Sequence, residues 1–189
     1  MRGTKSIREI LSTGCRWTKD CVLQVVEIVD RQPRKFPQLV ECLWDTDPFV
    51  ASGAADALER VTRDQPSRIE KWKEPLLGLL LEAKEKRLRW NLALTVPRLK
   101  LTVPECRRTA VALESYLDDK SSVVKTSALH GLADLARQNP ESLPTAVDLL
   151  RLAERTGTPA MRARSRILLG KLEKPCKERR PLASLHMFT

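Results

Sequence analysis

Residues 119–135 read DKSSVVKTSALHGLADL, and this stretch decides the fold. Val124 is followed by Ala128, Leu132 and Leu135, at offsets of 4, 8 and 11 residues. Small or apolar residues at such offsets lie on one face of an α-helix. The segment therefore predicts an amphipathic helix that buries one stripe and exposes its other faces.

The same stripe recurs along the chain, which indicates an internal repeat. Its copies begin at residues 17, 50, 88, 124 and 161, so successive copies are 33 to 38 residues apart. A second stripe, with offsets of 0, 3, 4 and 7, follows each of the first four copies and begins at Phe36, Ile69, Cys106 and Leu143. Each repeat is therefore predicted to be a pair of helices. Because neither helix can form a core alone, the pairs must stack.

Prolines stand between the two stripes of each pair. Proline lacks an N–H and disfavours helix in the preceding residue, so it ends one helix and can begin the next. Pro75 and Pro97 lie deeper in their stripes, and we expect a kink or an early helix end at both. The separating prolines are Pro33, Pro66, Pro104 and Pro140.

The repeats resemble HEAT repeats in two turn-and-helix segments. One is Asp45-Thr-Asp-Pro-Phe-Val-Ala with Ala54 and Leu58, and the other is Asp119-Lys-Ser-Ser-Val-Val-Lys with Ala128 and Leu132. The resemblance implies an all-α, right-handed α-solenoid of about four and a half HEAT-like helix pairs, whose second helices line a concave surface. It also implies a ladder of turn aspartates and basic residues between repeats, formed by Asp45 or Asp47, Arg89, Asp119, Lys125 and Arg162.

We expect three parts in the chain. Residues 1–14 are interpreted as an N-terminal capping helix, because the end of a solenoid otherwise exposes apolar surface. Residues 15–173 form the HEAT-like repeat domain. Residues 174–189 carry two prolines and no repeat pattern, and we interpret them as a mobile C-terminal tail whose apolar residues dock on the last helix.

The five cysteines are odd in number and none forms a C-x2-C pair. With no apolar signal segment at the start and no apolar run of about 18 residues, this composition favours a cytoplasmic protein without a membrane anchor. Only His130 and His186 could supply imidazole ligands, and neither has a cysteine or another histidine at metal-binding spacing. No nucleophile, phosphate-loop or metalloprotease motif occurs. We therefore expect a non-enzymatic protein with no metal, cofactor or small-molecule substrate.

Charge is the main indication of function. The formal net charge is +10, from 34 basic and 24 acidic residues. Residues 84–108 hold 8 basic and 2 acidic residues, and residues 151–180 hold 10 and 3. A basic surface attracts anionic partners, although it can also be simply solvated. The candidate binding residues are Lys86, Arg87, Arg98, Lys100, Arg107, Arg108, Arg151, Arg155, Arg164 and Arg166.

The tryptophans are a second source of candidates. Trp17 and Trp72 lie on the stripes, so we interpret both as core residues. Trp44 and Trp90 lie off the stripes and could be exposed platforms for a base or a peptide, although large aromatic side chains more often pack between repeats.

Three functions are compatible with these patterns. The first is a HEAT-repeat scaffold that binds a protein partner, preferably an acidic one, through a concave surface. The alternative is a module that binds nucleic acid or another polyanion through phosphate contacts, which requires the two basic segments to share one face. The third is a HEAT-like DNA glycosylase for alkylated bases, which requires a pocket that places an acid such as Asp45 beside aromatic side chains.

Overall fold

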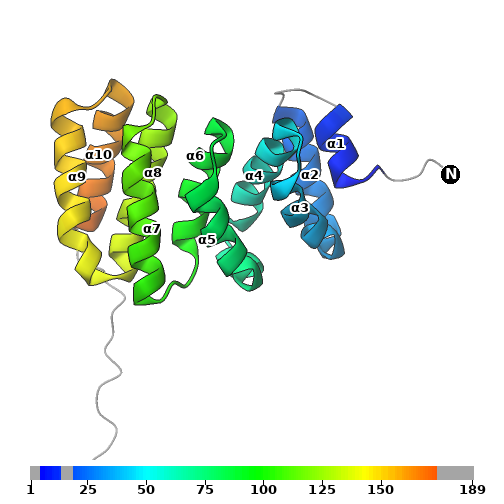
Figure 1. Ribbon diagram of the computed structural model, residues 1–189, viewed down its shortest axis with the longest axis horizontal. Helices are drawn as coiled ribbons and strands as arrows, with labels where there is room; N and C mark the ends of the chain where they lie inside the picture. Colours follow the sequence, from blue (N-terminus) through cyan, green and yellow to red (C-terminus); the bar gives the residue numbers. More distant parts are fainter. Residues whose placement is uncertain (1–4, 14–18, 174–189) are drawn as a thin grey trace, which may run out of the picture.

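The computed structural model describes residues 5–13 and 19–173, and its helices stand side by side in a row (Figure 1). The described part of the chain contains no β-strand. It forms the α-helices α1 (Ile7–Thr13), α2 (Lys19–Arg31), α3 (Phe36–Glu41), α4 (Pro48–Thr62), α5 (Lys73–Glu82), α6 (Lys86–Thr95), α7 (Val103–Ser115), α8 (Ser122–Gln138), α9 (Leu143–Thr156) and α10 (Pro159–Leu172). It also forms the 3₁₀ helices η1 (Pro33–Lys35), η2 (Cys42–Trp44), η3 (Pro66–Trp72), η4 (Val96–Arg98), η5 (Tyr116–Asp118) and η6 (Pro140–Ser142).

The helices follow the predicted repeat. The stripes beginning at residues 50, 88, 124 and 161 lie in α4, α6, α8 and α10. The second stripes lie in α3 with η2, in η3 with α5, in α7 and in α9. Successive helices form the pairs α2–α3, α4–α5, α6–α7 and α8–α9, followed by α10. The predicted all-α solenoid is thus confirmed. None of the helices in residues 5–13 and 19–173 is long and apolar enough to cross a membrane.

The two deeper prolines behave differently from each other. α6 ends at Thr95, just before the 3₁₀ turn that contains Pro97, so the expected early end occurs there. The expectation for Pro75 was wrong, because η3 takes up the first part of its stripe and α5 begins only at Lys73. Pro75 consequently lies in the first turn of α5, where an N–H would have no partner within the helix.

The short helix α1 covers one end of the row. Ile7, Ile10 and Leu11 are buried, and α1 contacts α2, α3 and α4. The guanidinium of Arg8 binds Asp45, with 2.6 Å between Nε and Oδ2. The stripe residue Trp17 and the expected tail at 174–189 lie outside the described residues.

Only part of the expected ladder forms. Arg89 on α6 pairs with Asp119, whose Oδ1 also accepts a hydrogen bond of 2.7 Å from the Ser121 N–H. Asp45 pairs with Arg8 of the capping helix rather than with a repeat residue. Within the described residues, Lys125 and Arg162 form no ion pair, so these two ladder assignments were wrong.

The first helices of the pairs pack closely against one another. They contact their neighbours more extensively than the second helices do. At Gly131 on α8 a Cβ atom would lie only 2.4 Å from the carbonyl oxygen of Ala93 on α6, so the two backbones meet without a side chain between them. Small residues such as Ala54, Ala57 and Ala128 are likewise fully buried in this layer. Close packing of this layer shortens it relative to the layer of second helices.

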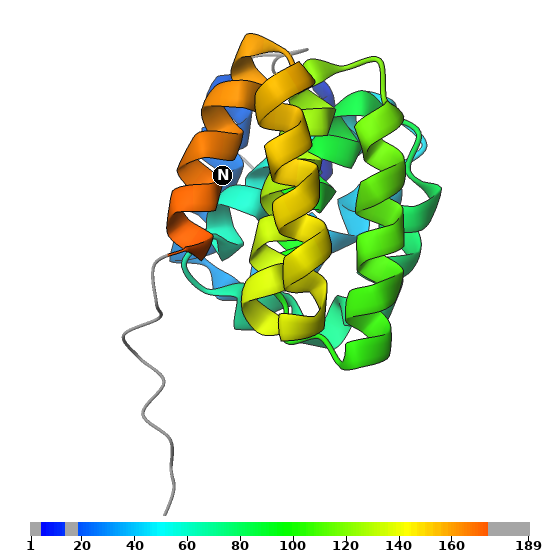
Figure 2. The same cartoon turned by 90° about the vertical axis from the view of Figure 1, so that its left-hand side faces the viewer.

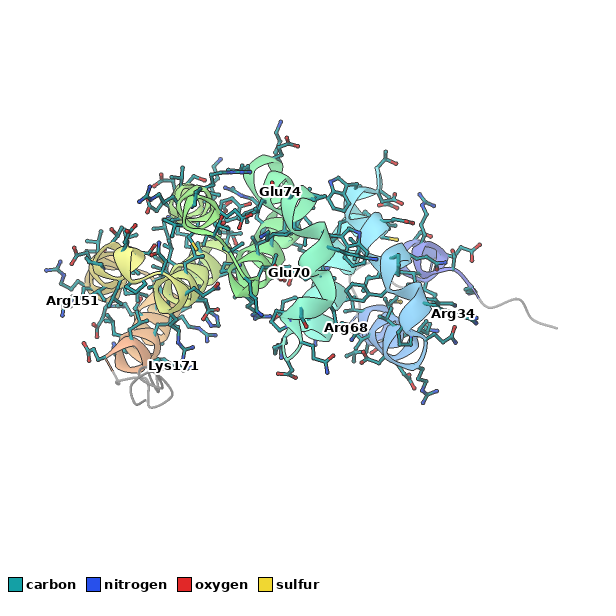
Figure 3. The ribbon with its side chains drawn as sticks, turned by 90° about the horizontal axis from the view of Figure 1, so that it is seen from below. Arg34, Arg68, Glu70, Glu74, Arg151 and Lys171 are labelled. Carbon is teal, nitrogen blue, oxygen red and sulfur yellow. The ribbon has the colours of Figure 1, made fainter. Side chains whose placement is uncertain are left out.

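The row is curved, and the first helices lie on its inner side. Figure 3, which looks along the helices, shows α2, α4, α6, α8 and α10 following the hollow side of the arc. Viewed from the end of the row, α10 and α7 lie on opposite sides (Figure 2). The expectation that second helices line the concave surface was therefore wrong. The closer spacing of the first helices explains the direction of the curvature.

Candidate binding groove

The predicted basic residues do not form one surface. Arg107 and Arg108 lie on the second helix α7, and each approaches a carboxylate, at 3.0 Å from Glu141 and 3.9 Å from Glu74 respectively. Arg151 and its neighbour along the helix, Arg155, are exposed on α9, with Arg151 at the far end of the row (Figure 3). These four residues belong to the outer layer of helices.

Other members of the predicted set have separate surroundings. Arg87 lies 3.7 Å from Asp56 and 5.7 Å from the centre of the Trp90 ring. Arg166 on α10 pairs with Glu154 on α9, at 3.3 Å. Lys86 and Lys100 are exposed at the start of α6 and in the loop before α7. The backbone carbonyl of Lys100 accepts a hydrogen bond from Lys73.

The two candidate tryptophans differ in burial. Trp44 ends η2 with 46% of its surface exposed. Trp90 is partly buried against the core, so it is not an exposed platform. Trp72 packs on the core beside Phe36, with 5.4 Å between ring centres, as expected for a stripe residue.

Two of the predicted residues, Arg98 and Arg164, do come together. They line a groove of about 770 Å³ that runs across the ends of α4 and η4 and along α8 to α10. All of these elements belong to the inner layer of the arc, so we refer to this hollow as the concave groove. Its lining contains Glu59, Arg63, Pro66, Leu94, Pro97, Arg98, Thr126, Ser127, His130, Asp134, Arg137, Gln138 and Arg164.

Glu59 holds two arginines at the floor of the concave groove. Its Oε1 atom accepts a hydrogen bond of 2.8 Å from Arg98 Nη2, and its Oε2 atom accepts one of 2.7 Å from Arg63 Nη2. Burial opposes ionisation of Glu59, but the hydrogen bonds from the two guanidiniums outweigh it and lower the pKa of the carboxyl group. The Glu59 side chain is only 6% exposed, so this ionised carboxylate fixes both arginines from below.

His130 lies among cations on the α8 wall of the groove. Burial lowers its pKa, and Arg164, Arg98 and Lys171 lower it further, whereas Asp134 acts in the opposite direction. The His130 Nε2 atom is 3.8 Å from Asp134 Oδ2, beyond normal hydrogen-bond distance. The imidazole is therefore held in its neutral form in a positively charged environment.

Positive charge exceeds negative charge in the groove. Its lining carries four arginines against the two carboxylates Glu59 and Asp134. Among the described residues, Arg137 and Arg164 form no ion pair. Two cations are thus available in the groove, one on α8 and one on α10.

The sequence could have indicated part of this site. Arg63 and Arg137 both follow the first residue of their repeat stripe by 13 positions, so they occupy equivalent places at the ends of α4 and α8. Neither residue was predicted from the sequence, because the candidates came from basic segments and not from basic residues at a repeated position. Glu59 and His130 gave no such indication.

The groove lacks the acid beside aromatic side chains that the third candidate function, a HEAT-like DNA glycosylase, requires. None of its lining residues is a tryptophan, tyrosine or phenylalanine. Asp45 lies elsewhere, bound to Arg8 and to the Asp47 N–H. In residues 5–13 and 19–173, no group of three His, Cys, Asp or Glu side chains is placed to hold a metal ion.

No protein-family model and no curated protein sequence matches the chain. Among solved structures, it is similar to the crystal structure of an engineered protein from the Northeast Structural Genomics Consortium, with a TM-score of 0.58. The two share 17% sequence identity, and the match covers 88% of this chain and 79% of the other. At this identity the similarity concerns the fold alone.

Proposed function

We propose that the protein is a non-enzymatic, HEAT-like binding scaffold that holds an acidic segment of a protein partner in the concave groove. The observation that carries this proposal is the pair of arginines without a carboxylate partner among the described residues, Arg137 and Arg164, facing a common groove. Solvent-exposed basic residues gain little from single contacts, but several cations around one hollow select a negatively charged ligand.

The shape and lining of the groove favour a protein segment. Leu94, Pro66 and Pro97 contribute apolar surface beside the arginines, which suits a chain that carries both acidic and apolar side chains. An extended segment could lie along the groove from α4 to α10 and contact several repeats. Solenoids commonly provide extended concave binding surfaces of this kind.

A nucleic-acid interface receives less support. Such an interface requires many cations along one face, because each phosphate contact adds to affinity. Arg107, Arg108 and Arg151 lie in the outer layer, away from the concave groove, and the first two approach carboxylates. The lining of the groove also offers no aromatic side chain on which a base could stack.

Fluorescence anisotropy with three labelled probes tests the proposal. The probes are a 12-residue peptide of aspartate, glutamate and leucine, the same peptide with asparagine and glutamine in place of the acids, and a 12-base-pair DNA duplex. We expect the acidic peptide to bind at least about tenfold more tightly than the neutral one at 100 mM salt, since charge contacts supply the selectivity.

The decisive variant is R137E/R164E, which reverses the two groove cations. Its matched control is R151E/R155E, which reverses two exposed arginines on α9 and changes the net charge equally. We expect the first variant to lose peptide binding and the control to retain it. Equal losses in both variants, or tighter binding of the DNA duplex than of the acidic peptide, would contradict the proposal.

The same proposal places the protein in the cytoplasm. Cys42 and Cys106 are buried free thiols, which suits a reducing compartment. Burial raises the pKa of the Cys42 thiol to about 11. Burial also raises the pKa of the Cys106 thiol above its ordinary value, so both thiols stay protonated near neutral pH. Fractionation of cells followed by immunodetection tests this location.

A further inference from the structure

We propose that the concave groove recognises a phosphorylated serine or threonine within the acidic segment, with Arg98 and Arg164 as the phosphate contacts. This inference rests on the proposed function and specifies its ligand. It assigns the phosphate to the part of the groove where η4, α8 and α10 meet.

Arg98 provides the first observation. Its side chain is 15% exposed, and its Nη2 atom is occupied by Glu59. Its Nη1 atom is buried and has no hydrogen-bond partner among the described residues. A buried cationic donor without a partner is costly, so the Arg98 guanidinium, which lines the groove, has unused hydrogen-bonding capacity that an anionic ligand could satisfy. The bond to Glu59 also holds the guanidinium in place before any ligand arrives.

The surrounding charges provide the second observation. Arg164, Arg98 and Lys171 all lie close enough to His130 to act on its ionisation, and Asp134 is the acidic group that faces it. Lys171 lies on α10 on the inner side of the arc (Figure 3). His130, Arg98 and Arg164 line the same groove, and the net effect of the nearby cations on the imidazole shows that positive charge prevails in this part of it.

A phosphate monoester fits this arrangement better than a carboxylate. It carries nearly two negative charges at neutral pH and three acceptor oxygens, so one group can bind guanidiniums from two walls at once. Guanidinium forks match phosphate oxygens in pairs of parallel hydrogen bonds. A dianion would also favour protonation of His130, which would add a further N–H donor to the site.

Isothermal titration calorimetry with two peptides tests this inference. One is a 12-residue acidic peptide with a central phosphoserine, and the other has glutamate at that position. We expect the phosphopeptide to bind at least about tenfold more tightly, the range typical of added charge-assisted hydrogen bonds. Inorganic phosphate at millimolar concentration should compete with the phosphopeptide for the groove.

The variants are chosen so that folding is preserved. R98K can keep the ion pair with Glu59 but lacks the second guanidinium nitrogen, and R164Q changes an exposed side chain on α10. The matched control is R155Q, which changes an exposed arginine on α9. We expect R98K and R164Q to remove the preference for phosphate while R155Q retains it. Histidine NMR should also show the pKa of His130 rising when phosphopeptide binds to the wild-type protein.

The outcomes separate this inference from the proposed function. Equal affinity for the two peptides, still abolished by R137E/R164E, would overturn the phosphate assignment and leave the acidic-segment scaffold intact. Absence of binding by both peptides would overturn both. A phosphate preference that R155Q reduces as much as R164Q would also overturn the assignment, because the site would then lie outside the groove.

Discussion

Tyr116 donates a hydrogen bond of 2.5 Å from its hydroxyl group to the carbonyl oxygen of Leu80, and this bond links the ends of two successive second helices. Leu80 lies in the last turn of α5, where carbonyl groups lack partners within the helix. The Tyr116 side chain is buried, and Arg89 lies 3.9 Å from the centre of its ring. The Tyr116 side chain thus caps α5 in the preceding repeat. It also packs against Arg89, which forms the ion pair with Asp119.

The Tyr116→Phe variant should be less stable than wild type by about 1–3 kcal/mol, because it leaves the buried Leu80 carbonyl without a partner. Urea denaturation followed by circular dichroism measures this difference. The ring remains in place, so the slope of the transition should not change. A free energy of unfolding equal to that of wild type would show that the hydrogen bond contributes nothing.

Gly131→Ala should destabilise the protein by about 1–3 kcal/mol, although alanine favours helix more than glycine does. The added methyl group would meet the Ala93 carbonyl oxygen at 2.4 Å and force α8 away from α6. Gly170→Ala on α10 is the matched control, because no atom lies within 4 Å of a Cβ there. The control should gain about 0.5–1 kcal/mol. Thermal denaturation of both variants tests the close approach of α8 to α6. A higher melting temperature for both variants would contradict it.

Glu59→Gln should cost about 3 kcal/mol, because it leaves the guanidinium of Arg98 largely buried without its counter-charge. Arg98→Met alone should also destabilise, since it leaves Glu59 without one of its two arginines. A double-mutant cycle measures the coupling between the two residues, and we expect about 1–3 kcal/mol. Additive effects of the two substitutions would mean that Glu59 does not position Arg98.

Glu105 should make stability depend on pH in the acidic range. The Thr102 N–H donates to Glu105 Oε2 at 2.6 Å in a capping box at the start of α7. This bond, opposed by burial and assisted by Lys73, lowers the pKa of Glu105 to about 2. A folded-state pKa below the unfolded value contributes stability that is complete above about pH 4.5 and is lost as pH falls towards 2.

Glu105→Gln isolates that contribution, since it keeps an oxygen acceptor but removes the charge. The variant should be less stable than wild type by about 1 kcal/mol at pH 7, the usual size of an N-terminal cap. The difference should shrink as pH is lowered from 4.5 to 3 in urea denaturation. If the stability difference between the two proteins stays constant over this pH range, the effect comes from the packing of the side chain and not from its charge.

His130 should affect stability at a higher pH. Burial and the cations Arg164, Arg98 and Lys171 lower its pKa in the folded state despite Asp134. Protonation therefore favours the unfolded chain, so the stability contributed by neutral His130 is complete above about pH 6.5 and is lost as pH falls below it. We expect His130→Gln to lose less stability than wild type between pH 7.5 and 5. Parallel pH profiles for the two proteins would contradict this.

The repeat, the helix pairs and the helix ends were predictable from local patterns. Val124, Ala128, Leu132 and Leu135 are spaced so that a helix, but not a strand, places them on one face, and all four are buried in α8. Pro97 ends α6 because its ring and missing N–H act on the neighbouring turn, whatever the tertiary structure. The kink or helix end expected at Pro75 shows the limit of this reasoning. The 3₁₀ helix η3 precedes α5, so α5 begins only at Lys73 and Pro75 lies in its first turn.

The sequence by itself determined that the chain forms a row of stacked helix pairs, because helix periodicity is a local property. Only the tertiary structure decided that the first helices lie on the inner side, because curvature depends on the difference in spacing between two layers. It also decided which charges meet. Glu59, Arg98 and Arg164 are far apart in sequence, and their convergence depends on the rotation between successive repeats, which composition and periodicity do not specify.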